Sequence, residues 1–181
     1  MVQITDLLER NKEIAKTHVP FPYLPEAAAQ GFPKANVLVH PQFRNQQNAN
    51  KMISRVQLDA VCIRNVCGHV TPNITDILGA HFLIGFTQIM IVHHTDCGAT
   101  YFTDDDIRRA LKARQSLSGV GVGVEDAAVI DAMGFGAIGK DIGKSVRDDV
   151  EILVGNPLFP REEVEVRGFV FDIKTGVLME A

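Results

Sequence analysis

Four side chains that can bind metals or transfer protons follow one apolar run in this sequence of 181 residues. The run IMIV, residues 89–92, is typical of a buried strand, and His93, His94, Asp96 and Cys97 come directly after it. A histidine and a cysteine at a strand-to-loop turn can direct an imidazole nitrogen and a thiolate at one ion, and these donors suit zinc. Neighbouring strand residues point to opposite faces, so only one of the two histidines can face a given site.

The segments that must position these residues alternate between strand-like and helix-like patterns. This alternation predicts an α/β fold with a mostly parallel central sheet flanked by helices. Ser145 is expected to cap the last helix, and 165–181 is expected to form a C-terminal hairpin that turns at Lys174, Thr175 and Gly176. Strands are expected at 35–40, 59–65 and 87–94, helices at 73–85, 103–114 and 145–157, and a mobile loop between two helices at 118–128.

Composition limits the classes of partner. The formal net charge of −4 gives no electrostatic reason to expect nucleic acid or an anionic membrane surface. No apolar run reaches the roughly 18 residues that span a bilayer, and the first residues do not resemble a secretory signal. We therefore expect a cytoplasmic protein. Its three cysteines are too few for a disulfide framework, which favours packing, metal ligation or thiol chemistry.

Polar residues also follow the other expected strands. His40, Gln42 and Arg44 come after the first strand, and Arg64 and Asn65 end the second. Ligands of open parallel sheets bind beyond the carboxyl ends of the strands. We therefore expect these residues to gather with the group after residue 92.

The segment 63–111, which begins IRNVCGHV and contains HHTDCG, resembles the central part of the β-class carbonic anhydrases. In that family an Arg-Asn-Ala-Gly-Gly loop, a helix and a strand lead to a His-Thr-Asp-Cys-Gly zinc motif. The segment 145–176 resembles the C-terminal helix and hairpin of the same family. The resemblance implies a family domain at 35–181, preceded by an N-terminal helical arm at 1–34.

The first metal motif departs from the family pattern. Family members carry Cys-x-Asp-x-Arg after the first strand, where the cysteine binds zinc and the aspartate pairs with the arginine. Here His40, Gln42 and Arg44 occupy those positions. The resemblance therefore implies a Zn²⁺ site formed by His40, His94 and Cys97. Gln42 would orient the substrate or a water, and Arg44 would position the neighbouring loop or an anion.

Two functions are compatible with this pattern. One is a zinc-dependent lyase that uses an activated water to hydrate CO2 or a related electrophile such as COS or CS2. Its substrate in the reverse direction would be bicarbonate. The other is an inactive family member with a binding, regulatory or assembly role. Cys67 either replaces the lost thiolate or fills space beside a turn. His69 is either an exposed loop residue or part of a pocket.

Assembly is implied by the same resemblance. Family members form dimers in which the N-terminal helices embrace the partner. This chain has a matching amphipathic arm, with Ile4, Leu7, Leu8 and Ile14 on one side. Such a short helix is marginal in water unless it packs on a surface. We therefore expect a homodimer, or two dimers paired into a tetramer.

Overall fold

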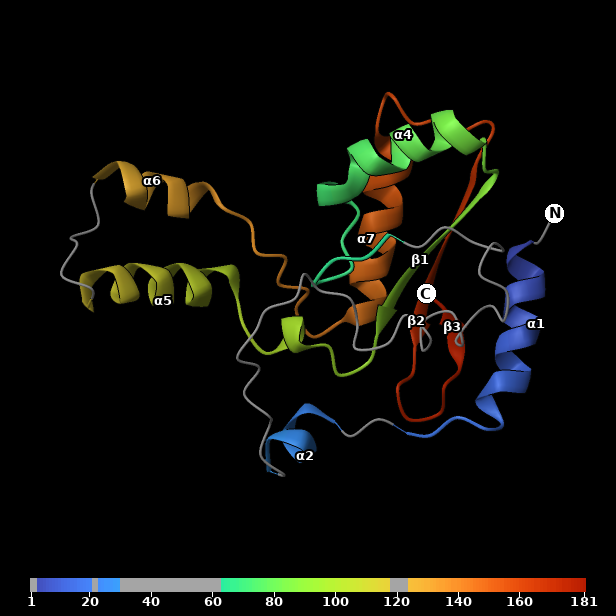
Figure 1. Cartoon of the computed structure of the whole chain (residues 1–181), viewed down its shortest axis with the longest axis horizontal. Helices are drawn as coiled ribbons and strands as arrows, with labels where there is room; N and C mark the ends of the chain where they lie inside the picture. Colours follow the sequence, from blue (N-terminus) through green and yellow to red (C-terminus); the bar gives the residue numbers. More distant parts are fainter. Residues whose placement is uncertain (1–2, 21–22, 30–62, 118–123) are drawn as a thin grey trace.

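The computed structural model describes residues 3–20, 23–29, 63–117 and 124–181 (Figure 1). The predicted strand 35–40 lies outside these residues, as do His40, Gln42 and Arg44. The described elements in chain order are α1 (Ile4–Ala15), α2 (Leu24–Ala29), η1 (Thr71–Asn73), α4 (Ile74–Ile84), β1 (Gln88–His94), η2 (Gly98–Thr100), α5 (Asp104–Leu117), α6 (Val124–Ala132), α7 (Ile142–Gly155), β2 (Glu165–Phe171) and β3 (Leu178–Glu180).

The described strands form one sheet in the order β1-β2-β3. β1 and β2 are parallel, with Gln88 opposite Glu165 and His94 opposite Phe171, while β3 returns antiparallel to β2. Gly176 turns the hairpin with φ 74, a left-handed conformation that glycine adopts without steric cost. The predicted α/β fold with a C-terminal hairpin is thus confirmed.

Helices pack against both faces of this sheet (Figure 1). On one face, Ile91 of β1 packs with Val146 and Leu153 of α7. Gly168 of β2 allows α7 to lie close, because a Cβ atom at that position would be 2.4 Å from a methyl group of Val146. On the other face, Ile4 of α1 joins Phe169, Phe171 and Leu178. The sheet is therefore the middle layer of three, and its two faces have separate cores.

The N-terminal helix α1 is fixed to its own chain by polar as well as apolar contacts. The Ile4 N–H donates to the Gln88 side chain over 2.8 Å. Asn11, which is 2% exposed, donates to the Gly176 carbonyl over 2.8 Å and accepts from the Leu178 N–H over 2.9 Å. The apolar side of the arm thus has the surface that such a short helix requires.

The start of α7 differs from the predicted start. Asp141, not Ser145, is the N-cap residue, and its carboxylate accepts a hydrogen bond from the Lys144 N–H over 2.8 Å. Ser145 lies inside the helix and is buried. Both residue types are good caps, but the carboxylate also favours the positive end of the helix dipole, which explains the earlier start.

Two further predictions were partly wrong. Residues 63–65, the described end of the predicted strand 59–65, belong to no strand. The segment 124–128, which was expected to continue a loop, forms the beginning of α6. Its sequence, VEDAA, contains no glycine, and its two alanines favour a helix.

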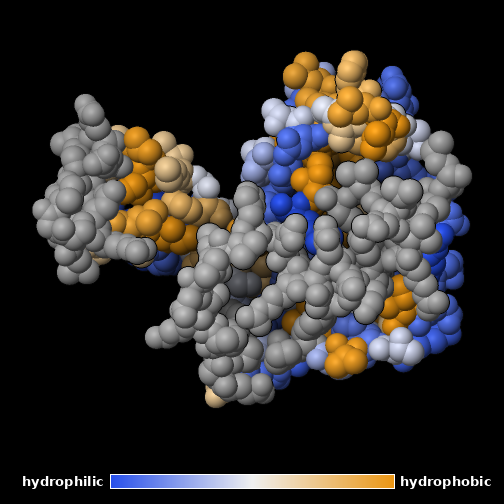
Figure 2. Space-filling view, viewed as in Figure 1, coloured by the Kyte–Doolittle hydropathy of each residue, from blue (hydrophilic) through white to orange (hydrophobic). Residues whose placement is uncertain are grey.

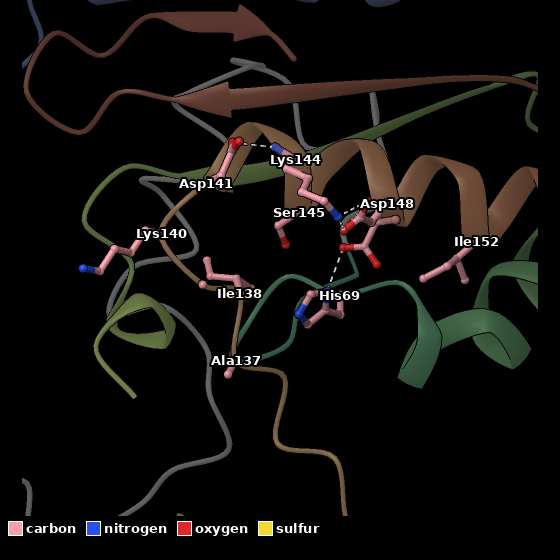
Figure 3. A pocket seen from close by; sticks show the side chains of 11 residues that line it. His69, Ala137, Ile138, Lys140, Asp141, Lys144, Ser145, Asp148 and Ile152 are labelled. Carbon is pink, nitrogen blue, oxygen red and sulfur yellow. Dashed lines mark hydrogen bonds and ion pairs between the residues drawn. The ribbon is translucent and has the colours of Figure 1, made fainter. Parts of the chain in front are cut away.

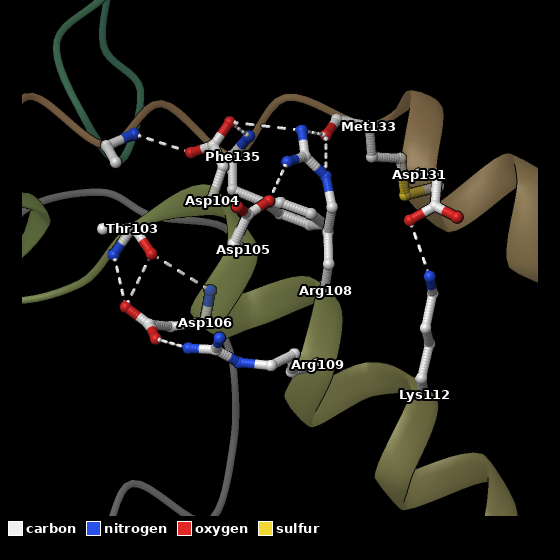
Figure 4. Close-up of polar contacts among 11 residues, drawn as sticks. Thr103, Asp104, Asp105, Asp106, Arg108, Arg109, Lys112, Asp131, Met133 and Phe135 are labelled. Atoms are coloured by element: carbon white, nitrogen blue, oxygen red, sulfur yellow. Dashed lines mark hydrogen bonds and ion pairs between the residues drawn. The ribbon is translucent and has the colours of Figure 1, made fainter.

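The helices α5 and α6 extend side by side from the body of the molecule (Figure 1). Asp106 accepts hydrogen bonds from the N–H and hydroxyl of Thr103 at the start of α5 (Figure 4). Lys112 and Asp131 connect the two helices by an ion pair of 2.6 Å.

In the described part of the chain, no helix is long and apolar enough to cross a membrane.

Candidate metal centre

The carboxyl end of β1 directs two consecutive histidines to opposite faces of the sheet. Ile91 belongs to the core under α7, while Val92 packs in the core on the α1 side. By the same alternation His93 lies on the α7 face, where it is 3% exposed, and His94 lies on the other face, where it is half-buried. The expectation that the two histidines serve different surroundings is met.

His94 and Cys97 form a hydrogen-bonded pair at the end of β1. The chain turns between them at Asp96, whose φ of 55 lies in the left-handed region. The Nδ1 atom of His94 is 2.9 Å from the Thr95 carbonyl oxygen. A carbonyl oxygen only accepts, so Nδ1 carries the proton and Nε2 is the ring nitrogen left for a metal.

The hydrogen bond between these side chains favours the thiolate form of Cys97 and proton binding at His94. Burial raises the pKa of the Cys97 thiol. The hydrogen bonds with His94 and the Ala99 N–H lower it by more than burial raises it, so the net shift is downward. The hydrogen bond with Cys97 raises the pKa of His94 against the opposing effect of burial. Thiolate and imidazole are the donors that zinc prefers, so the two side chains fit a zinc ion.

Cys67 lies in the same apolar cluster as Cys97. Its thiol donates a hydrogen bond to the Phe135 carbonyl over 3.3 Å. Burial raises its pKa, and the nearby Cys97 and Asp104 raise it further. These contacts stabilise a neutral thiol that fills space. The described residues thus bring together His94, Cys97 and Cys67 of the predicted site and its alternative, whereas His40, Gln42 and Arg44 lie outside them.

A second polar cluster lies on the α7 face of β1. Asp149 of α7 is 1% exposed, and its Oδ2 atom is 2.8 Å from Nδ1 of His69 and 3.1 Å from Nε2 of His93. The contact with His69 is a hydrogen bond, while the ring of His93 is close but not aligned for one. These three side chains can present one ligand atom each within 4.8 Å of one another.

The carboxylate at the centre of this cluster is ionised. Burial raises the pKa of Asp149, but contacts with His93 and His69 and the hydrogen bond from the Val70 N–H lower it below its ordinary value. The Val70 N–H reaches the other carboxylate oxygen, Oδ1, over 3.2 Å. Oδ2 therefore faces the two histidines.

A cavity of about 360 Å³ opens over His69 and Asp149 (Figure 3). Figure 3 shows His69 reaching from its loop toward the carboxylate on α7. Lys140, Lys144 and Asp148 line other parts of the wall. Of the two alternatives for His69, the pocket residue is the one observed.

Sequence reasoning missed Asp149, although its position carried a signal. Val146 and Leu153 were expected to face inward, and residue 149 is three positions after the first and four before the second. Residues at these spacings share one face of a helix. An acidic residue on an apolar helix face needs a buried partner, and His69 and His93 were the unassigned candidates.

Comparison with known proteins gives a consistent set of relatives, although no protein-family model matches the sequence. The sequence is 34% identical over 131 residues to β-carbonic anhydrase 1 of Mycobacterium tuberculosis, covering 72% of each chain. The fold is similar to the carbonic anhydrase of Streptococcus mutans, with a TM-score of 0.60, 30% identity and 72% of each chain covered. It is also similar to the apo form of a carbon disulfide hydrolase, with a TM-score of 0.53, 26% identity, and 67% of this chain and 65% of that chain covered.

Proposed function

Because this chain belongs to the β-carbonic anhydrase family, we propose that it is a zinc-dependent lyase that hydrates CO2 or a related small electrophile such as COS or CS2. The observation that carries the proposal is the pairing of His94 with Cys97 at the end of β1. Its donors suit zinc, and the hydrogen bond to Thr95 leaves Nε2 of His94 for the ion.

The proposed site has three protein ligands, His40, His94 and Cys97. Bound zinc would acidify water and so supply a nucleophile near neutral pH. Gln42 orients the substrate or the water through its amide, which can both donate and accept a hydrogen bond. Arg44 positions the neighbouring loop or holds an anionic product. Exchange of one family thiolate for His40 removes a negative charge from the site, which favours ionisation of the water.

A second candidate is a family member without turnover that binds a small anion at the same place. The sequence feature that favours it is Gln42, where the family pattern has an aspartate. An amide accepts no proton and does not neutralise Arg44, so the arginine remains available for an anion.

The test combines metal analysis of the purified full chain with stopped-flow assays of CO2 hydration and of COS and CS2 hydrolysis. The enzyme proposal expects zinc bound through Cys97 and turnover of at least one substrate. Bound zinc with turnover of none of the three substrates would support the binding role. A chain that takes up no zinc through Cys97 would refute the enzyme proposal, and a Cys97→Ser variant supplies the matched background.

A further inference from the structure

We propose that His69, His93 and Asp149 form a second site, separate from the one at His94 and Cys97, that binds a divalent transition-metal ion through nitrogen and oxygen. The three residues belong to the loop before η1, to β1 and to α7. His93 and His94 point to opposite faces of β1, so the two sites have no residue in common. This inference does not depend on the proposed function.

The spacing of the donor atoms suits such an ion. Metal–ligand bonds of about 2.1 Å at octahedral or tetrahedral angles place neighbouring donor atoms about 3.0–3.4 Å apart. Oδ2 of Asp149 is 2.8 Å from Nδ1 of His69 and 3.1 Å from Nε2 of His93. If the distance between Oδ2 of Asp149 and Nδ1 of His69 increased by a few tenths of an ångström, a metal ion would fit in place of the proton between them. The two imidazole rings are nearly perpendicular, at 87°.

His93 supplies an independent reason to expect a ligand. Its side chain is 1% exposed, and neither ring nitrogen has a hydrogen-bond partner among the described residues. A buried polar atom without a partner is costly, and a metal bond from Nε2 would satisfy one of the two. Gly68 lets its loop lie close to the ring, because an added Cβ would be 2.7 Å from the ring carbon Cδ2 of His93.

The charge of the cluster favours a cation over an anion. Asp149 is a buried carboxylate, and in the described part of the chain neither lysine nor arginine forms an ion pair with it. Lys144, on the same cavity wall, pairs with Asp148 over 2.6 Å. A divalent ion at Oδ2 would compensate the buried charge, while the Val70 N–H bond to Oδ1 orients the carboxylate from behind.

The cavity provides access and room for the remaining ligands. It reaches His69 and Asp149 from solvent, and its volume of about 360 Å³ accommodates several waters. Two histidines and one carboxylate with open positions suit first-row ions such as Zn²⁺, Co²⁺ or Fe²⁺. The site would thus bind its ion through nitrogen and oxygen, whereas the proposed site at the end of the same strand uses a thiolate.

Cobalt titration of the full chain separates the two sites, because only a thiolate ligand gives an intense sulfur-to-cobalt charge-transfer band. We expect Cys97→Ser to abolish this band yet retain one equivalent of Co²⁺ with weak ligand-field absorption. Adding Asp149→Asn to that variant should weaken the remaining binding at least tenfold. His69→Gln, at a partly exposed position, should do the same where the asparagine change impairs folding, as judged by circular dichroism. Glu151→Gln, on the exposed side of α7, is the control and should change nothing.

Each remaining outcome overturns one site. Loss of all Co²⁺ binding in Cys97→Ser would refute the second site, and so would residual binding that neither Asp149→Asn nor His69→Gln weakens. A wild-type chain with one equivalent and a full charge-transfer band would leave the thiolate site standing alone. Two equivalents without that band would instead refute Cys97 as a ligand.

Discussion

Cys97 and His94 change each other's proton affinity through the hydrogen bond between them. The hydrogen bond between them lowers the pKa of the thiol and raises that of the imidazole. Cys67, in the same cluster, has a raised pKa and a thiol bonded to the Phe135 carbonyl. The thiolate that binds metal at neutral pH should therefore be that of Cys97.

Substitution of the ligands tests this difference. We expect His94→Ala, Cys97→Ser and His40→Ala each to lower zinc content severely, because a site with three protein ligands rarely tolerates the loss of one. Cys67→Ser should retain the metal, and elemental analysis of the four purified variants is the measurement. To separate this site from the one at Asp149, the comparison is made in an Asp149→Asn background. Loss of zinc in Cys67→Ser with retention in His40→Ala would identify Cys67 as the third ligand.

Gln42 is the residue that most directly separates this chain from the family pattern. Gln42→Asp should restore a charge-assisted hydrogen bond to Arg44, a type of bond that contributes about 1.5–3 kcal/mol. CO2 hydration should then rise, and His40→Cys combined with Gln42→Asp should raise it further. Stopped-flow rates normalised to bound zinc are the measurement. If the double variant binds zinc without turnover, CO2 is not the substrate.

At the scale of single residues, the sequence was more informative about one group of candidate residues than about the other. Local spacing could predict that His94 and Cys97 lie close together, because one strand and one turn carry both. The cluster of His69, His93 and Asp149 could not, since it depends on how α7 packs across β1 and on the close approach of the loop at Gly68. Helical spacing places Asp149 on the buried face of α7, but it does not show which side chains the packing brings to that carboxylate.

At the scale of elements, Asp104 joins the start of α5 to the chain that follows α6 (Figure 4). Its two carboxylate oxygens accept hydrogen bonds from the N–H groups of Phe135 and Ala137, both over 3.0 Å. Arg108 lies 3.7 Å away on the next turn of the helix. One side chain thus holds the segment that leads from α6 to α7, where the cavity wall begins.

This arrangement predicts a pH-dependent contribution to stability. The hydrogen bonds from Ala137 and Phe135 outweigh burial and lower the pKa of Asp104, with help from Arg108 and His69. For a lowered pKa, the stabilisation is present above the unfolded value of about 3.9 and is lost as the pH falls through the folded value.

Asp104→Asn should therefore lower the free energy of unfolding by on the order of 2 kcal/mol at pH 7, since one backbone donor loses its charged acceptor. The difference between wild type and variant should shrink below about pH 4. Urea unfolding across this pH range measures it, with Asp105→Asn on the exposed side as the control. A difference that stays constant at all pH values would contradict the role of the charge.

Element types were easier to predict than element ends. Apolar patterns predicted the regions of β1, α4, α7 and the hairpin, and the N-cap and charge pattern predicted α5. The start of α7 was not predicted, since Asp141 and Ser145 are both competent caps and only the geometry of the preceding chain decides between them. The beginning of α6 was not predicted, because the glycine-rich sequence before it favours a loop.

At the scale of the whole molecule, the apolar surface is divided between a covered part and an exposed part. The apolar side of α1 is buried on its own sheet through Ile4 and Leu7. By contrast, Phe82 and Leu83 at the end of α4 are 89% and 78% exposed. Figure 2 shows apolar side chains gathered over α4, at the top of the view. Large exposed side chains that lie together favour an interface.

We expect the chain to form a two-fold homodimer in which α4 contributes to the interface. A two-fold contact uses the same patch on both copies, so the apolar end of α4 in each copy would be buried in one interface. Light scattering at micromolar concentration should give about twice the 19.9 kDa mass of one chain, or four times for paired dimers. Phe82→Ser with Leu83→Ser should shift the equilibrium toward monomer, whereas Val19→Ser, at a position that is 79% exposed, should not. A wild-type mass of about 20 kDa would contradict dimer formation. A dimer unchanged by the α4 substitutions would assign the interface to another surface, because two polar replacements at its centre would remove the apolar area that stabilises it.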